Sequence, residues 1–91
     1  RAEEIATVNS HTRPDGSKCF TVLKEYGVTA VPTGENAAWG SVSPQEVVDA
    51  WMQSEGHRAN ILNPEARAMG VGYYYNSSST WGHQWIQIFT K

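Results

Sequence analysis

Cysteine is nearly absent from this 91-residue chain, which contains Cys19 and no other cysteine. A single thiol cannot form an internal disulfide, so neither a disulfide scaffold nor a cysteine-rich zinc site is possible. Cys19 lies between Lys18 and Phe20, beside the apolar face of a predicted helix. That setting favours a buried structural thiol over a nucleophile.

An excess of positive charge and long apolar runs are lacking as well. The formal net charge is −2, and the seven Lys and Arg residues are scattered, so nothing suggests a nucleic-acid-binding surface. The apolar runs are only a few residues long, whereas a membrane-spanning helix needs roughly 20 apolar residues. We therefore predict no membrane span. The chain shows no charged-then-apolar leader, so we expect any signal peptide to lie outside it.

Aromatic residues, in contrast, are plentiful for the length of the chain. The sequence has four Trp, four Tyr and two Phe, and 40% of its residues are hydrophobic. Large rings bury more area than aliphatic side chains, so we expect them to make up much of the core. Residues 1–91 are predicted to form a single small domain.

Hydrophobic periodicity predicts helices first and strands last, which indicates an α+β fold. The clearest helix start is Ser43-Pro44-Gln45-Glu46, with a capping Ser, Pro at the first helical position and Glu three residues after the cap. Val47, Val48 and Trp51 are expected to face the core from this helix. Three further helices are predicted at residues 1–8, 18–26 (with Ser17 as cap) and 54–62.

The last third of the chain changes to the alternation of strands. Residues 69–75 and 84–90 are rich in β-branched and aromatic side chains, and the polar run 76–80 separates them. This pattern predicts an antiparallel hairpin. The segment 28–40 is interrupted by Pro32, Gly34 and Gly40 and is predicted to be irregular or extended.

Three polar segments each supply a side chain that titrates or binds metal near neutral pH, namely His11, Glu35 and His57. We predict that folding brings them together. Two imidazoles and one carboxylate would form an open site for a divalent cation such as zinc. The alternative is that each is structural: a hydrogen-bonded histidine, or a carboxylate that satisfies backbone donors or pairs with Arg13 or Arg58. Arg13 and Arg58 are also candidates to pair with Asp15.

The known catalytic patterns mostly fail. The sequence has no His-Glu-x-x-His helix, no Gly-x-Ser-x-Gly turn and no Gly-rich phosphate loop. Ser54 and His57 have helical spacing, but nothing marks a strained nucleophile turn, so this pair is not favoured as catalytic machinery. Asn60, on the same predicted helical face as His57, is expected to bond nearby backbone.

Five motifs in this order resemble the CAP superfamily, and more narrowly its bacterial SCP-like extracellular branch. Its eukaryotic relatives include cysteine-rich secretory proteins and pathogenesis-related proteins. The resemblance covers nearly the whole chain. The motifs lie at residues 11–16 (HTRPDG), 34–36 (GEN), 51–62 (WMxSxGHRxNIL), 70–73 (GVGY) and 85–89 (WIQIF).

The resemblance implies an α-β-α sandwich with a small antiparallel sheet between helical layers. It also implies a secreted or cell-wall location, and a cavity lined by two His and two Glu that can take a divalent metal. His11 and Glu35 match two of these positions. Ser54 stands where eukaryotic members have Glu, and Gln84 where they have the second His, with His83 one residue earlier. The residues expected to line the cavity are His11, Glu35, Asn36, Ser54, His57 and Gln84.

No general catalytic activity is established for the bacterial branch that this chain resembles. Three functions therefore remain open. The first is a secreted binding or interaction module for a protein, lipid or cell-wall ligand. The alternative is a metal-assisted extracellular hydrolase with His11 and His57 as ligands and Glu35 as ligand or base. A purely structural wall protein is the third reading. The family's N-terminal helix is expected ahead of Arg1. Without it we expect exposed apolar surface, and either self-association or a longer protein of which this chain is a part.

Overall fold

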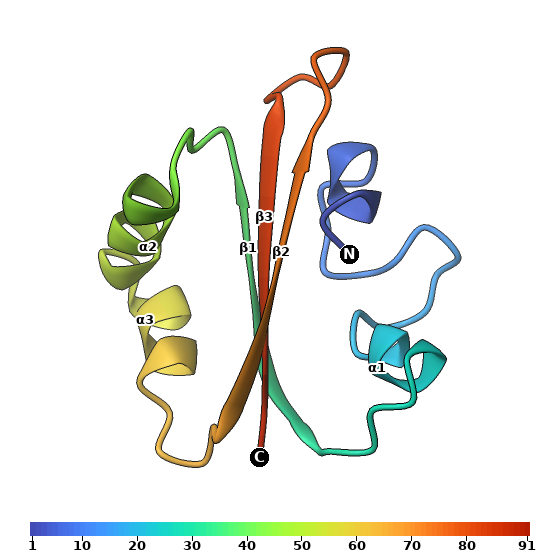
Figure 1. Cartoon of the computed structure of the whole chain (residues 1–91), viewed down its shortest axis with the longest axis vertical. Helices are drawn as coiled ribbons and strands as arrows, with labels where there is room; N and C mark the ends of the chain where they lie inside the picture. Colours follow the sequence, from blue (N-terminus) through green and yellow to red (C-terminus); the bar gives the residue numbers. More distant parts are fainter.

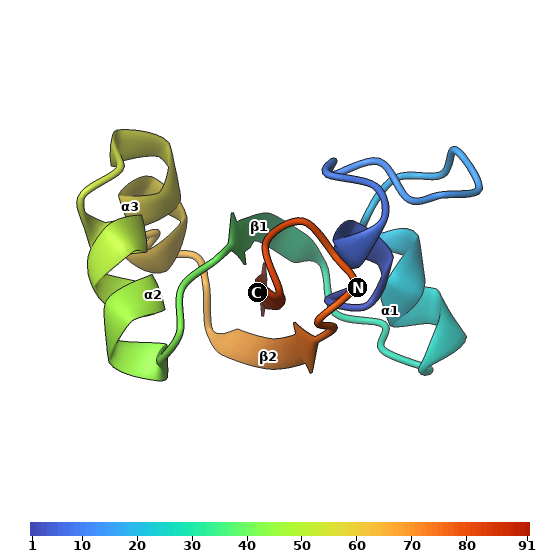
Figure 2. The ribbon, with the colours of Figure 1, turned by 90° about the horizontal axis from the view of Figure 1, so that it is seen from above.

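A three-stranded sheet stands between two layers of helices and loops in the computed structural model, which describes residues 1–91 (Figure 1). Helices α2 and α3 form one outer layer, and the N-terminal segment with α1 forms the other (Figure 2). This arrangement confirms the predicted α+β class and the layered sandwich. The elements are η1 (Glu4–Ala6), α1 (Thr21–Glu25), β1 (Pro32–Trp39), α2 (Pro44–Met52), α3 (Glu55–Ile61), β2 (Ala68–Tyr75) and β3 (His83–Thr90).

The last strand of the chain is the centre of the sheet. The strand order is β1-β3-β2, and β3 is antiparallel to both neighbours. The predicted hairpin is therefore confirmed, with Tyr73 opposite Trp85. The segment predicted as irregular or extended contains a full strand, β1. Its four central residues are all buried, so the alternation that identifies a half-exposed strand is missing.

Each face of the sheet carries its own small hydrophobic core. Ile5 and Ala37 pack with Ile86 on the N-terminal side, and Trp51 and Trp85 pack with Val47 on the side of α2. The buried indole groups find hydrogen-bond acceptors. Trp51 Nε1 donates to the Ala37 carbonyl oxygen at 3.2 Å, and Trp85 Nε1 donates to that of Ser41 at 2.8 Å. The aromatic residues therefore join the layers as well as fill them.

The N-terminal layer is less helical than predicted. The helix expected at residues 1–8 is only the short 3-10 helix η1, and the one expected at 18–26 is the five-residue α1. Ser17 does not cap α1, because its hydroxyl donates to Asp15 Oδ1 at 2.6 Å within the preceding turn. Such local bonds compete with helix formation. Gly27, with φ of 72°, follows the end of the helix.

The opposite layer follows the sequence closely. Ser43 caps α2 by accepting a hydrogen bond from the backbone N–H of Glu46 at 3.1 Å. Val47 and Trp51 are buried as predicted, but Val48 is 39% exposed and does not face the core. With 9 residues, α2 is the longest helix, and no helix has the length and apolar character to cross a membrane.

The cap of α2 gives a direct test of this local prediction. Ser43→Ala removes the acceptor for the Glu46 N–H and is expected to lower the free energy of unfolding by about 1 kcal/mol. Urea unfolding followed by circular dichroism measures this change. Ser43→Asp restores an acceptor and should recover most of the loss. Equal stability of Ser43→Ala and the wild type would show that the cap contributes nothing.

Candidate functional site

The three predicted polar segments meet around β1, but on two faces of the sheet. Successive side chains of a strand point to opposite sides. Glu35 therefore faces the N-terminal layer, where it contacts Arg1 and His11. Asn36 faces α3, where it bonds Asn60. The predicted single site is thus two polar clusters separated by one strand.

Glu35 is the centre of the first cluster. Its side chain is only 2% exposed, and both oxygens have partners. Arg1 donates from Nε to Oε2 at 2.9 Å and from Nη2 to Oε1 at 3.2 Å. A buried carboxylate needs such compensation, since its isolated charge would be very costly. Sequence reasoning missed Arg1 as the partner. Its position gave a weak signal, because it looked like one charged residue of an ordinary helix.

His11 lies at the outer end of this cluster. Its side chain is 60% exposed, and Nδ1 lies 2.7 Å from Glu35 Oε1. An ionised carboxylate only accepts hydrogen bonds, so Nδ1 carries the proton. In the neutral ring this leaves the lone pair of Nε2 free. Metal-binding histidines commonly have this arrangement, in which a carboxylate fixes the tautomer.

His57 has its own orienting partner on α3. Its Nδ1 is 2.8 Å from the Ser54 hydroxyl oxygen. Burial, with a further contribution from the nearby His11 ring, lowers the pKa of His57 below its usual value. His57 is therefore neutral at pH 7. Neither the Ser54 hydroxyl nor the His57 ring forms a hydrogen bond with Glu35.

A buried amide network holds the second cluster together. Asn36 is fully buried, and its Nδ2 donates to the His57 carbonyl oxygen at 3.0 Å and to Gln87 Oε1 at 3.1 Å. Asn60 Nδ2 donates to Asn36 Oδ1 at 2.9 Å and to the Glu35 carbonyl oxygen at 3.3 Å. The prediction that Asn60 bonds nearby backbone is confirmed. Gln87 was missed, because only the strand register places it beside Asn36.

Gly34 allows α3 to approach this closely. A Cβ atom at Gly34 would lie 2.6 Å from Asn60 Oδ1, well inside contact distance. Any larger residue must displace the Asn60 amide and break its two bonds to β1. The glycine of the Gly34-Glu35-Asn36 motif is therefore required by packing.

Gly34→Ala is expected to cost about 1–3 kcal/mol of unfolding free energy, as overpacking of a tight contact usually does. Asn60→Ala removes the clashing atoms along with the hydrogen bonds. Gly34→Ala should therefore lower the free energy of unfolding less in the Asn60→Ala background than in the wild type. A double-mutant cycle measured by urea unfolding isolates this coupling. Additive losses would show that the two residues do not compete for space.

Gln84 is not brought together with the other predicted site residues. It pairs with Trp39, whereas Glu35 pairs with Ile88, four residues further along β3, or about 13 Å at the usual rise per residue. Gln84 is fully buried beside Ser79, in the turn between β2 and β3. Its role there is to satisfy polar groups at the end of the hairpin.

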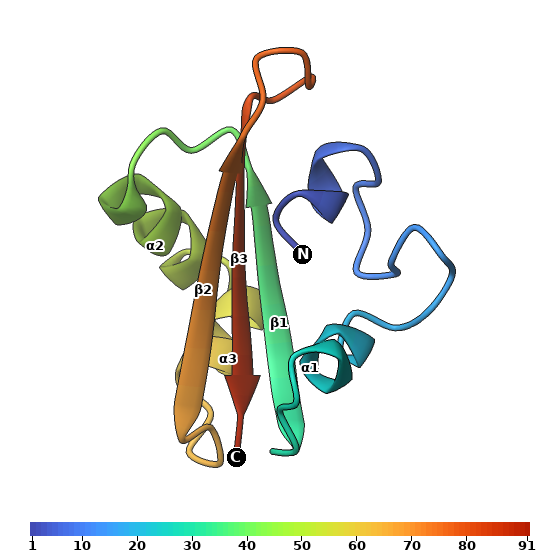
Figure 3. The same cartoon turned by 45° about the vertical axis from the view of Figure 1, so that its right-hand side comes forward.

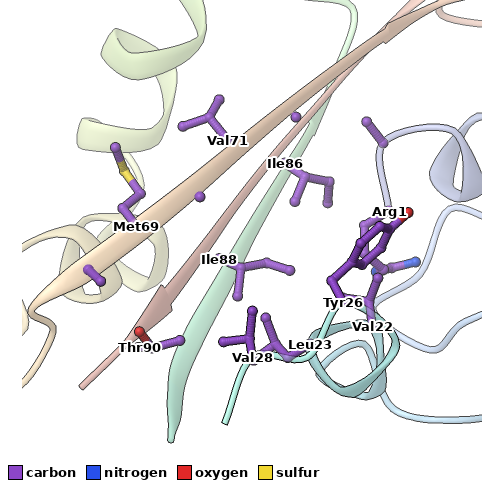
Figure 4. A pocket seen from close by; sticks show the side chains of 14 residues that line it. Arg1, Val22, Leu23, Tyr26, Val28, Met69, Val71, Ile86, Ile88 and Thr90 are labelled. Carbon is purple, nitrogen blue, oxygen red and sulfur yellow. The ribbon is translucent and has the colours of Figure 1, made fainter. Parts of the chain in front are cut away.

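The six residues predicted to line a cavity line none of the pockets of the structure. No set of three or more His, Cys, Asp or Glu side chains is gathered as metal ligands would be. A pocket of about 570 Å³ lies instead on the N-terminal face of the sheet, between β2, β3 and α1 (Figure 4). It is mainly apolar, and Leu23, Val28 and Ile88 are among its lining residues.

Cys19 is buried, as predicted for a structural thiol. Burial and the neighbouring Glu35 carboxylate raise the pKa of its thiol to about 11, so the reactive thiolate is scarce at neutral pH.

A second charge network fixes the loop that carries His11. Arg13 contacts the carboxylates of Glu4 and Glu25, with its closest bond from Nη2 to Glu4 Oε2 at 2.7 Å. The alternative in which Arg13 pairs with Glu35 or Asp15 is therefore wrong, and Arg58 forms no ion pair with either residue. The turn at residues 13–16 directs the guanidinium of Arg13 toward η1 and α1.

Hydrogen bonds from Arg13, supported by Arg1, lower the pKa of Glu4 to about 2. A carboxyl group with a depressed pKa stabilises the fold above its unfolded value, near 4.5, and loses that contribution as pH falls toward 2. We expect stability to fall between pH 5 and about pH 2. The fall should be smaller in Glu4→Gln than in the wild type. Thermal unfolding across this range measures the difference, and parallel curves would contradict it.

Sequence comparisons match the chain to one family model and to two bacterial proteins. The model of the cysteine-rich secretory protein family, CAP, matches residues 1–89. The uncharacterized protein YkwD of Bacillus subtilis is 47% identical over 76 residues, which are 84% of this chain and 29% of that protein. The uncharacterized membrane protein YlbC of the same organism is 40% identical, with 76% of this chain and 23% of that protein covered. The chain thus spans less than a third of either relative, and no solved structure matches it significantly.

Proposed function

The chain belongs to the cysteine-rich secretory protein family, CAP, and from this premise we propose that it is an extracellular or cell-wall-associated binding module. Its ligand site is the pair of histidines, His11 and His57, which extend from the two polar clusters on either side of β1 and would share a ligand at the edge of this strand. The ligand that this pair suits is a divalent cation such as Zn²⁺, or a small molecule with hydrogen-bond donors for two imidazole nitrogens.

One observation carries the proposal. Each ring uses Nδ1 for a partner of its own, Glu35 for His11 and Ser54 for His57. Neither Nε2 atom has a hydrogen-bond partner, and His57 presents a lone pair there in the tautomer whose Nδ1 donates to the Ser54 hydroxyl. The lowered pKa of His57 keeps its ring neutral at pH 7, which is the form that donates a lone pair. In each ring, Nδ1 would fix the orientation of the imidazole, and Nε2 would bind the ligand.

In this proposal Glu35 orients His11 and is not itself a ligand. The carboxylate would have to leave its ion pair with Arg1 before it bound a cation or accepted a proton from water. Two nitrogen ligands with no free carboxylate suit weak, exchangeable metal binding. They offer little support to the hydrolase alternative, because a general base must reach the attacking water.

The test is a calorimetric titration of Zn²⁺ into the wild type, His11→Ala and His57→Ala at pH 7.5 and pH 5.5. Binding is expected at pH 7.5 and should weaken at pH 5.5, since protons compete with the cation for imidazole nitrogens. Each substitution should abolish most of the heat. His83→Ala is the matched control, because His83 bonds Tyr73 at the other end of β3.

Glu35→Gln distinguishes orientation from ligation. Replacing a residue that orients a metal-binding side chain typically lowers the metal affinity about 10–100-fold. Binding of Zn²⁺ to Glu35→Gln should therefore weaken but persist. Equal affinity in the wild type and both histidine variants would refute the two-histidine site. The hydrogen-bonded clusters would then have a structural role only.

A further inference from the structure

The outward backbone groups of the sheet are covered at the β1 edge and uncovered at the β2 edge. Which residues point their backbone groups outward follows from the hydrogen bonds at the ends of the strands. The backbone N–H of Gly40 bonds the His83 carbonyl oxygen, and that of Asn76 bonds the Gly82 carbonyl oxygen, both at 2.8 Å. In an antiparallel ladder, alternate residues of a strand bond the same neighbour. Following the register along β2, its even-numbered residues bond β3 and its odd-numbered residues direct their backbone groups outward.

Side chains cover the outward groups of β1. The carbonyl oxygen of Glu35 accepts from Asn60 Nδ2, and that of Ala37 accepts from Trp51 Nε1. Helices α2 and α3 thus close this edge. No further strand can pair there without displacing both side chains.

The edge of β2 has no such cover. Its outward carbonyl and N–H groups have no hydrogen-bond partner. Figure 3 shows β2 as an outer strand of the sheet, and in Figure 2 no element lies beyond it. Edge strands usually carry a charge, a proline or a bulge that prevents further pairing. From residue 68 to residue 82 the sequence has no charged residue and no proline, and the β2–β3 register is continuous. The outward-bonding residues also expose large apolar side chains, at 55%, 61%, 49% and 56% for Met69, Val71, Tyr73 and Tyr75.

We propose that β2 pairs with β2 of a second copy of this chain, to form a two-fold symmetric dimer with a continuous six-stranded antiparallel sheet. The two-fold axis passes beside Gly72. Val71 then lies opposite Tyr73 of the second copy, and Met69 lies opposite Tyr75 of the second copy. All four outward residues of each strand are paired in this register, which gives about eight backbone hydrogen bonds, two for each pair.

The side chains of β2 favour this self-pairing. Opposite residues of an antiparallel pair share a face, so valine meets tyrosine and methionine meets tyrosine, both of which are stabilising contacts. On the other face, Gly72 meets Gly72 of the second copy, and Gly70 leaves room for the Tyr74 ring of that copy. No like charges face each other, because the strand has none. The side chains of β2 therefore suit pairing with β2 of a second copy.

Sedimentation velocity of the 91-residue chain over a range of concentrations tests the dimer. The wild type should show a monomer–dimer equilibrium. Val71→Lys places two lysines in the interface and should raise the dissociation constant about tenfold or more. Val31→Lys and Val42→Lys are matched controls, since both residues are exposed but lie outside β2. They should leave the equilibrium unchanged.

Cross-linking tests the register independently of any loss of affinity. In the proposed dimer the two copies of Gly72 form a non-hydrogen-bonded pair with Cα atoms about 4.5 Å apart, within reach of a disulfide. Gly72→Cys should therefore cross-link under mild oxidation. Gly70→Cys should not, because its two copies lie about 13 Å apart in this register. The wild type controls for Cys19, which is buried.

Three results would overturn the proposal. They are a wild type that stays monomeric at all concentrations, a dimer that Val71→Lys does not weaken, and equal cross-linking of the two cysteine variants. A monomer whose β2 edge binds an added extended peptide would likewise show that the edge serves a different partner.

Discussion

Side-chain alternation along β1 is the constraint on which the rest of the polar architecture depends. Glu35 and Asn36 are adjacent in sequence, but they must face opposite layers of the sandwich. Glu35 therefore fixes the N-terminal segment through Arg1, and Asn36 fixes α3 through Asn60. One short motif thereby connects both layers to the sheet. The two histidines that we propose as a binding site extend from these two anchors.

The burial of Glu35 decides what the site can do. A carboxylate taken out of water is stable only with close compensation, and Arg1 and His11 supply it. The same contacts occupy both oxygens, so the group that looks most reactive in the sequence is the one least free to react. In the proposed site the Nε2 atoms of His11 and His57 bind the ligand instead. A binding role fits this distribution of contacts better than a catalytic one.

At each edge of the sheet, the hydrogen bonding of the outward backbone groups decides whether another strand can pair there. At β1 the Trp51 and Asn60 side chains complete the hydrogen bonding of outward carbonyl groups and leave no template for another strand. At β2 the outward groups are open, and the exposed side chains beside them are apolar. A sheet of three strands with one protected edge has a single direction in which it can grow.

The sequence by itself determined the features that depend on near neighbours. The Ser43 cap and the β2–β3 hairpin both follow from residues a few positions apart, and the spaced motifs identified the family. Only the tertiary structure decided that Arg1 binds Glu35, that residues 32–39 form a strand and that Gln84 lies apart from the histidines. These outcomes depend on the pairing of β1 with β3, whose residues are about fifty positions downstream. Local propensity carries no information about such a distant partner, and the face to which each side chain points is fixed only when the two strands pair.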